Sequence, residues 1–347
     1  MLLARSHPAW NDAISALHRQ SAAQKEPSDV TIAVFNAGHD TAFRRVELDA
    51  LQPDGVDGLR WIDVVDPSRE EIRRLGDLFG FHPLALEDVL KGQQRPKVDI
   101  YEDYFFVVIY ALDPAGSDRR WEIAVFVKRE LVVTVRERGV PAFETAIRRF
   151  SEHCKDQRSP TSTMLLYTIA DSIVDDYFPC MDAIAEEIDQ LEADMFDSPD
   201  RDELRAIFRM RQRLLALRRV VAPAREVFNA LIRRELPLLG EQSLYYFQDV
   251  YDHVIRVTDS IDADRDMLAS ALDVHLSLAA NRMNQTVRTL TAASILLMSL
   301  ALVAGIYGMN FEVMPELEWR YGYLFALGVM AAIGSALAAL FRWLRWW

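Results

Sequence analysis

The spacing of hydrophobic positions divides the chain into a strand-rich part and a helical part. Between Val30 and Arg136 it alternates polar stretches with short apolar runs typical of strands. Two helical patterns lie among them, one over 69–79 with Ser68 as the expected N-cap and one after Pro83. The break at 128–130 predicts a hairpin turn. The strands are expected over 31–35, 43–48, 61–65, 104–112, 123–127 and 131–135. This pattern predicts an α/β domain.

After Pro141 the strand patterns stop, and three long helical segments follow at about 161–195, 201–234 and 242–306. The second is rich in basic residues and follows an acidic stretch, which predicts an antiparallel helical hairpin. No stop signal interrupts the third, so it is expected to be one helix of roughly 100 Å at about 1.5 Å per residue. Such a helix must pack against other helices or against copies of itself.

Two segments near the end, 289–306 and 323–341, contain no charged side chain. Each approaches the roughly 20 apolar residues that cross a membrane. A buried core helix has the same pattern, but two such runs at the end of a charged chain favour membrane spans.

The charges that flank the two spans predict their orientation. Two arginines precede the first span and two follow the second, and positive flanks belong on the cytoplasmic side. We therefore expect a multi-pass protein of the cell (inner) membrane with both termini in the cytoplasm. The loop between the spans is acidic and should face outward; its carboxylates are Glu312, Glu316 and Glu318.

These patterns predict six consecutive parts. They are a cytoplasmic α/β domain (1–160), long cytoplasmic helices that include the stalk leading into the first span (161–288), a first transmembrane helix (289–306), an external loop (307–322), a second transmembrane helix (323–341) and a cytoplasmic tail (342–347). No signal peptide is recognisable in 1–25, so the large N-terminal part is expected to stay where it is made.

Composition narrows the function further. The 347 residues carry a formal net charge of −13, which argues against nucleic acid as a partner and is compatible with cations. Cys154 and Cys180 are too few for a disulfide framework and are expected to be small buried side chains. The sequence has no phosphate-binding glycine loop, His-Glu-x-x-His or nucleophile elbow, so an enzyme is not expected.

Small and polar residues recur every seven positions along the first span. One row holds Asn284, Thr291, Met298 and Gly305, and the other holds Val287, Ser294, Ala301 and Gly308. Such a seam indicates either close helix packing or a lining that touches water. Its polar groups favour a pore, because facing lipid would be costly. Two heptads before Val287, Asp273 would form a carboxylate ring at the inner mouth of a symmetric oligomer. We also count Leu290 among the pore-lining candidates.

The end of the first span reads Tyr307-Gly308-Met309-Asn310-Phe311, and Met314-Pro315-Glu316-Leu317 follows. This resembles the CorA family of magnesium and cobalt transporters, whose signature is Gly-Met-Asn before a short Met-Pro-Glu-Leu loop. The resemblance extends over nearly the whole chain. Its other motifs are His82-Pro83-Leu84 with Glu87-Asp88, Gln94 to Val98, Asp175 to Phe178, and Asp249 to His253.

The resemblance implies a membrane protein with an N-terminal αβα cytoplasmic domain, long helices forming a funnel and two C-terminal transmembrane helices per subunit. It implies a homo-oligomer, a pentamer, with the first span lining the pore and Gly308, Met309 and Asn310 as selectivity filter. Asp88 and Asp249 correspond to an inter-subunit metal sensor, with Glu87 and Asp175 nearby. Mg²⁺ would be both transported and regulatory, with Co²⁺ and nickel as further cargo, and influx would follow the electrochemical gradient.

Two other functions remain open. One is a zinc transporter of the same superfamily, and the other is a membrane-anchored metal sensor or scaffold that conducts nothing. The chain departs from the family at Ser299 and Ala301, where proline and threonine are common, and its basic tail is reduced to Arg342 and Arg345. Gly308 and Asn310 also suit a plain helix stop.

Overall fold

The computed structural model describes residues 28–36, 43–52, 58–155, 160–197, 201–233, 243–309, 315, 319–344 and 346. The chain divides into two compact units. One comprises Met1–Leu191 and Arg205–Met267, and the other comprises Glu192–Leu204 and Leu268–Trp347.

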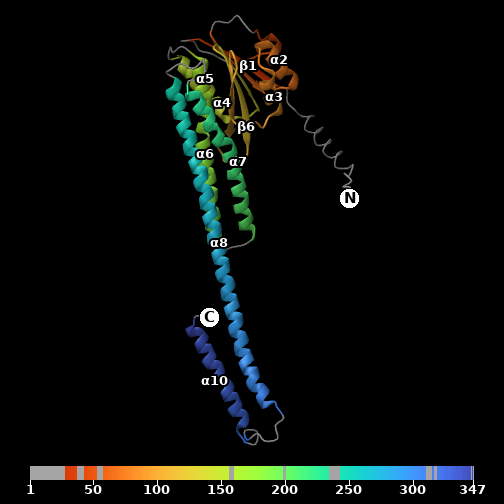
Figure 1. The fold of residues 1–347 in the computed structure, drawn as a ribbon, viewed down its shortest axis with the longest axis vertical. Helices are drawn as coiled ribbons and strands as arrows, with labels where there is room; N and C mark the ends of the chain where they lie inside the picture. Colours follow the sequence, from red (N-terminus) through yellow and green to blue (C-terminus); the bar gives the residue numbers. More distant parts are fainter. Residues whose placement is uncertain are drawn as a thin grey trace, which may run out of the picture. The chain divides into compact units, whose positions relative to one another are not determined.

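The first unit contains a seven-stranded mixed sheet in the order β2-β1-β3-β7-β6-β5-β4 (Figure 1). Its strands are β1 (Asp29–Phe35), β2 (Arg44–Arg45), β3 (Leu59–Val65), β4 (Lys97–Ile100), β5 (Phe105–Leu112), β6 (Arg120–Val127) and β7 (Leu131–Arg136). Only β3 and β7 pair in parallel among the described strands. All eight residues of β5 are buried, as expected for a continuous apolar strand covered on both faces. The predicted turn at 128–130 joins β6 to β7.

Three helices accompany the sheet. Helix α2 (Arg69–Phe79) begins at the predicted N-cap Ser68, whose side chain forms a capping box with Glu71, and ends at the left-handed Gly80. Helix α3 (Pro83–Lys91) begins at its proline, and the His82 side chain caps it by accepting a hydrogen bond from the Leu84 N–H. Helix α4 (Pro141–Lys155) buries an apolar face that includes Phe143 and Phe150.

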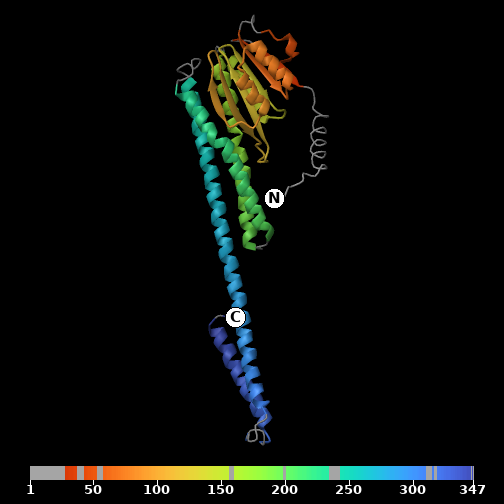
Figure 2. The same cartoon turned by 45° about the vertical axis from the view of Figure 1, so that its right-hand side comes forward.

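The long helices are α5 (Ser162–Asp175), α6 (Tyr177–Asp197), α7 (Arg201–Ile232) and α8 (Ser243–Tyr307). Within the first unit, α6, α7 and the beginning of α8 lie side by side (Figures 1 and 2). Arg213 of α7 pairs with Glu187 of α6 at 2.6 Å, in agreement with the predicted acid–base hairpin. Arg218 of α7 pairs with Asp262 of α8 at 2.8 Å, so α7 forms ion pairs with both α6 and α8.

The second unit consists mainly of the rest of α8 and of α10 (Gly322–Trp343). Both helices are long and apolar enough to cross a membrane, with windows of mean hydropathy 2.1 and 2.3. They run side by side (Figure 2), and the Leu300 side chain packs over Gly334, where α10 has no side chain. Close approach at a small residue is a common way for membrane helices to pack.

Two predicted elements differ from the structure, and two observed elements were not predicted. The strand expected over 43–48 is reduced to β2 and followed by the short 3-10 helix η1 (Leu48–Ala50). Strand β4 and helix α4 were not predicted, and the helix expected over 161–195 is broken at Asp176. Strand β4 is short and charged, as suits the edge of a sheet, which weakens its sequence signal. Cys154 and Cys180 are free and buried, as predicted.

Candidate metal and pore sites

An acidic cluster forms where α5 meets α8. Asp171 and Asp175 stand one turn apart on α5, so both project from the same helix face. His253 of α8 completes the cluster, and one ligand atom from each residue lies within 4.8 Å of the other two. A cavity of about 360 Å³ adjoins them and is also lined by Asp249.

The two carboxylates of this cluster share a single arginine as their positively charged partner. Burial, reinforced by the charge of Asp175, raises the pKa of Asp171 to about 6. Arg149 of α4 reaches in from the side and donates hydrogen bonds to Asp171 at 3.0 Å and to Asp175 at 2.8 Å. One guanidinium therefore compensates two carboxylates.

The same donor set fits a divalent cation. Carboxylate oxygens suit Mg²⁺, whereas the imidazole of His253 suits Co²⁺ and other transition metals. Within the described chain, the Nδ1 atom of His253 is buried without a hydrogen-bond partner, and its Nε2 atom lies 3.9 Å from Asp249 Oδ1. A buried polar atom without a partner is costly, so a metal ion would be favoured there.

The other predicted sensor residues lie on α3. Asp88 pairs with Lys97 at 2.7 Å, and the same lysine also contacts Asp99. Glu87 pairs with Lys91 one turn further along α3. In the described part of a single chain, the ion-pair partner of Asp88 is Lys97, and Asp249 Oδ1 lies 3.9 Å from His253 Nε2. The chain alone therefore does not join these two aspartates in one ion-pair cluster.

In the second unit, the predicted pore seam of α8 and the side of α8 that packs on α10 are different faces of the helix. The α8 residues covered there follow a helical stripe: Ala292 is buried and Leu296, Leu300, Val303 and Tyr307 are partly covered. At about 100° per residue, Ser294 and Met298 lie roughly 200° from Leu296 around the helix. The seam therefore points away from α10, and Met298 is 72% exposed.

All nine pore-lining candidates are exposed in the single chain: Asp273, Asn284, Val287, Leu290, Thr291, Ser294, Met298, Ala301 and Gly305. Residues 281–290 are exposed on every side, so exposure distinguishes the seam only further along the helix. Ser299 is partly covered instead, and its hydroxyl donates to the Ile295 carbonyl at 2.8 Å.

Helix α8 ends at Tyr307, at the start of the predicted filter. The Gly308 N–H donates to the Ala304 carbonyl at 2.9 Å, and a Cβ atom at Gly308 would come within 3.2 Å of that oxygen. Its backbone is not left-handed, so this helix stop does not use the usual glycine cap. Met309 is exposed. Asn310, Glu312, Glu316 and Glu318 lie outside the described residues.

Sequence reasoning missed three residues of the acidic cluster, namely Asp171, His253 and Arg149. Two of them had a local signal. Asp171 stands four positions before Asp175, and His253 four positions after Asp249, so each lies one helical turn from a predicted ligand. Arg149 had none, because its contact with α5 depends on how α4 packs.

Comparisons with known proteins agree with this architecture. A family model described as CorA-like Mg2+ transporter protein matches residues 56–344. The cobalt/magnesium transport protein CorA of Thermotoga maritima is 35% identical over 290 residues, covering 82% of this chain and 83% of that protein. The protein of the same name from Methanocaldococcus jannaschii is 27% identical, covering 83% and 91%. The solved structure of the magnesium transporter from that organism superimposes with a TM-score of 0.76, covering 92% of this chain and 98% of that chain.

Proposed function

The chain belongs to the CorA-like Mg2+ transporter family of divalent cation transporters, and we propose that it forms a homopentameric channel that admits Mg²⁺. In this proposal α8 lines the pore, both termini face the cytoplasm, and Co²⁺ is a second cargo. The observation that carries it is the seam of small and polar side chains on the side of α8 opposite α10. Because α10 does not cover that seam, it is available to line a water-filled path between subunits.

The proposed filter suits an ion that gives up its water reluctantly. A ring of Asn310 side chains can accept hydrogen bonds from the water that Mg²⁺ keeps. A carboxylate ring at the same place would hold the dication more tightly and slow its release, which conduction does not tolerate. The acidic loop residues Glu312, Glu316 and Glu318 would raise the cation concentration outside.

Regulation is proposed to use metal at the junction between subunits. Asp88 and Glu87 of one subunit would approach Asp249 of the next, beside the cluster of Asp171, Asp175 and His253. Carboxylates brought together repel each other until a dication lies between them. Bound Mg²⁺ would thus favour the state in which the subunits are close and the pore is shut.

Arg149 provides a test of the acidic cluster, because its guanidinium competes with any bound cation. We expect Arg149→Gln to strengthen Co²⁺ binding roughly tenfold, about 1.4 kcal/mol, since two carboxylates lose their neutralising partner. Titration calorimetry on the purified protein measures the affinity, and the visible spectrum of Co²⁺ reports ligation by His253. The matched control is Arg148→Gln on the same helix, an exposed arginine without an ion pair in the described chain. Equal Co²⁺ affinity in Arg149→Gln and the control would remove the cluster from the proposal.

Asp273 provides a test of the inner mouth. We expect Asp273→Asn to lower Mg²⁺ conductance several-fold at low ionic strength and much less at physiological salt. The physical reason is that screening shortens the reach of a carboxylate ring, from about 30 Å at 0.01 M to about 8 Å at 0.15 M. Single-channel recording at both salt concentrations measures the effect. Equal losses in the two conditions would contradict an electrostatic role.

Flux into liposomes tests the function as a whole. Purified protein should admit Mg²⁺ and Co²⁺, and a membrane potential negative inside should accelerate both. A preference for Zn²⁺ over Mg²⁺ would indicate a zinc transporter. Absence of flux for Mg²⁺, Co²⁺, Ni²⁺ and Zn²⁺ would instead favour the non-conducting sensor.

A further inference from the structure

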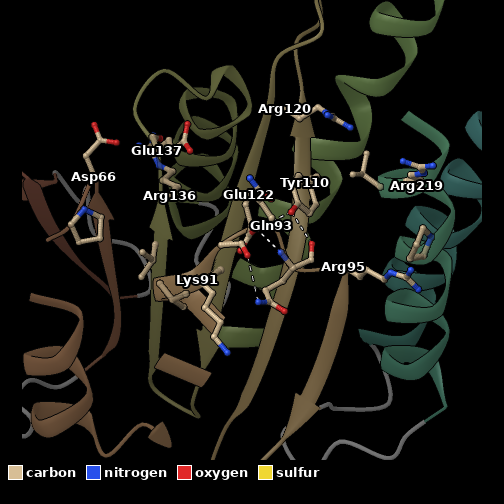
Figure 3. Close-up of a pocket in the computed structure, with 18 of the residues that line it drawn as sticks. Asp66, Lys91, Gln93, Arg95, Tyr110, Arg120, Glu122, Arg136, Glu137 and Arg219 are labelled. Atoms are coloured by element: carbon tan, nitrogen blue, oxygen red, sulfur yellow. Dashed lines mark hydrogen bonds between the residues drawn. The ribbon is translucent and has the colours of Figure 1, made fainter. Parts of the chain in front are cut away.

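A second cavity in the first unit lies away from the acidic cluster. It is a groove of about 1180 Å³ between the sheet and α7 (Figure 3). Its lining is unusual for a chain of net charge −13, because six cationic side chains meet only three acidic ones. The cations are Lys91, Arg95, Arg120, Arg136, Arg218 and Arg219.

Three of these cations are already neutralised. Arg136 pairs with the buried Asp63 at 2.7 Å, Arg218 pairs with Asp262, and Lys91 pairs with Glu87. The other three, Arg95, Arg120 and Arg219, have no carboxylate partner in the described part of the chain. Arg120 donates one hydrogen bond to the Ala216 carbonyl of α7 at 3.0 Å, which leaves its charge uncompensated.

The three uncompensated guanidiniums come from three separate elements. Arg120 begins β6, Arg219 lies on α7, and Arg95 lies in the loop before β4. Figure 3 shows them on the same side of the groove, whereas Asp66, Arg136 and Glu137 lie on the opposite side. Like charges repel, so their gathering on one side favours an anion between them.

The loop that carries Arg95 is held in a strained conformation. Gly92 and the non-glycine residue Gln93 both have positive φ, 62° and 54°. The Glu122 carboxylate fixes this loop by accepting a hydrogen bond from the Gln94 N–H at 2.9 Å, and the Tyr110 hydroxyl lies 2.8 Å from the same carboxylate. Strain in a non-glycine residue costs on the order of 1–3 kcal/mol and often marks a binding site.

The ligand should combine anionic and uncharged groups. Guanidiniums bind phosphate oxygens with two parallel hydrogen bonds, and three of them match a chain of phosphates better than one. On the α7 side the groove also has an apolar wall with Val220 and Pro223. Pro223 lacks an N–H, so the Arg219 carbonyl loses its helical partner and can accept a hydrogen bond from a ligand hydroxyl or amine.

We propose that this groove binds a small molecule carrying a chain of two or more phosphate groups, held by Arg95, Arg120 and Arg219. Such a ligand is either a nucleoside polyphosphate or an inorganic polyphosphate. The two share the anionic chain and differ in whether an organic part occupies the apolar wall.

The test is titration calorimetry on the full-length oligomer in detergent at fixed free Mg²⁺, with ATP, inorganic tripolyphosphate and inorganic phosphate as probes. ATP and tripolyphosphate should bind at least tenfold more tightly than inorganic phosphate. Tighter binding of ATP than of tripolyphosphate would identify the nucleoside form, and equal binding would identify the inorganic form. The variant Arg95→Gln, Arg219→Gln should weaken both by roughly 100-fold, about tenfold for each charge-assisted contact.

Two controls keep the result interpretable. Arg211→Gln changes an exposed arginine of α7 outside the groove and should leave both affinities unchanged. The single variant Arg219→Gln removes an exposed side chain and should weaken binding about tenfold even if the double variant does not fold. If neither ATP nor tripolyphosphate binds more tightly than inorganic phosphate, the proposal is wrong. It is also wrong if Arg219→Gln binds ATP like the parent while the double variant dissociates the oligomer, since the groove would then be a subunit interface.

Discussion

Replacing Asn310 by alanine should reduce Mg²⁺ uptake to the background of empty liposomes. Asn310 stands three positions after Tyr307, where α8 ends, and is the proposed polar side chain at the outer end of the seam that includes Ala301 and Gly305. Alanine has no carboxamide to accept hydrogen bonds from the water bound to Mg²⁺. The cost of removing the outer water shell of the ion is then not offset by the protein.

Two further variants sharpen this result. Asn310→Asp should bind Mg²⁺ more tightly and conduct it more slowly, because a ring of carboxylates holds the dication. Glu312→Gln removes a charge from the same loop and should lower uptake only modestly. Uptake of ²⁸Mg or a Mg²⁺-sensitive dye measures flux, and size-exclusion chromatography checks that the oligomer is intact. Undiminished flux in Asn310→Ala would overturn the filter assignment.

Much of the fold was predictable because its signals are local. Ser68 and Glu71 stand three apart, the spacing of a capping box, and α2 begins there. Strands β5, β6 and β7 are strongly apolar, and the charged residues 128–130 mark the hairpin turn between β6 and β7. Strand β4 was missed because it has only two apolar residues, Val98 and Ile100, and depends on β5 for its pairing.

The candidate sites were less predictable, because they depend on contacts between distant segments. The cluster of Asp171, Asp175 and His253 needs α5 and α8 to pack together, and periodicity does not determine which helices become neighbours. The groove beside α7 is formed by a loop, a strand and a helix. Arg95, Arg120 and Arg219 look like ordinary surface charges in the sequence, and what distinguishes them is that no carboxylate pairs with them in the described part of the chain.

Replacing Asp88 and Asp249 together by asparagine should abolish most of the closure by internal Mg²⁺, raising the half-inhibiting concentration at least tenfold. A ligand closes a channel only through its higher affinity for the closed state. At ten times the dissociation constant, each site contributes RT ln 11, about 1.4 kcal/mol, so the five sites of the proposed pentamer would contribute roughly 7 kcal/mol. About 5.5 kcal/mol is enough to move an equilibrium from 1:99 to 99:1. Weak sites can therefore act as a steep switch when five act together.

The matched control for this experiment is Asp99→Asn, at a carboxylate that shares Lys97 with Asp88. The Lys97 ammonium contacts both Asp88 and Asp99, so Asp99→Asn removes a carboxylate from the same lysine without touching the proposed sensor. Mg²⁺ uptake is measured against rising internal Mg²⁺, and protease resistance is compared with and without the ion. The double variant should stay open and gain little protection, while Asp99→Asn should close like the parent. If the double variant closes at the parent's internal Mg²⁺ concentration and gains the same protection, metal does not gate this channel through Asp88 and Asp249.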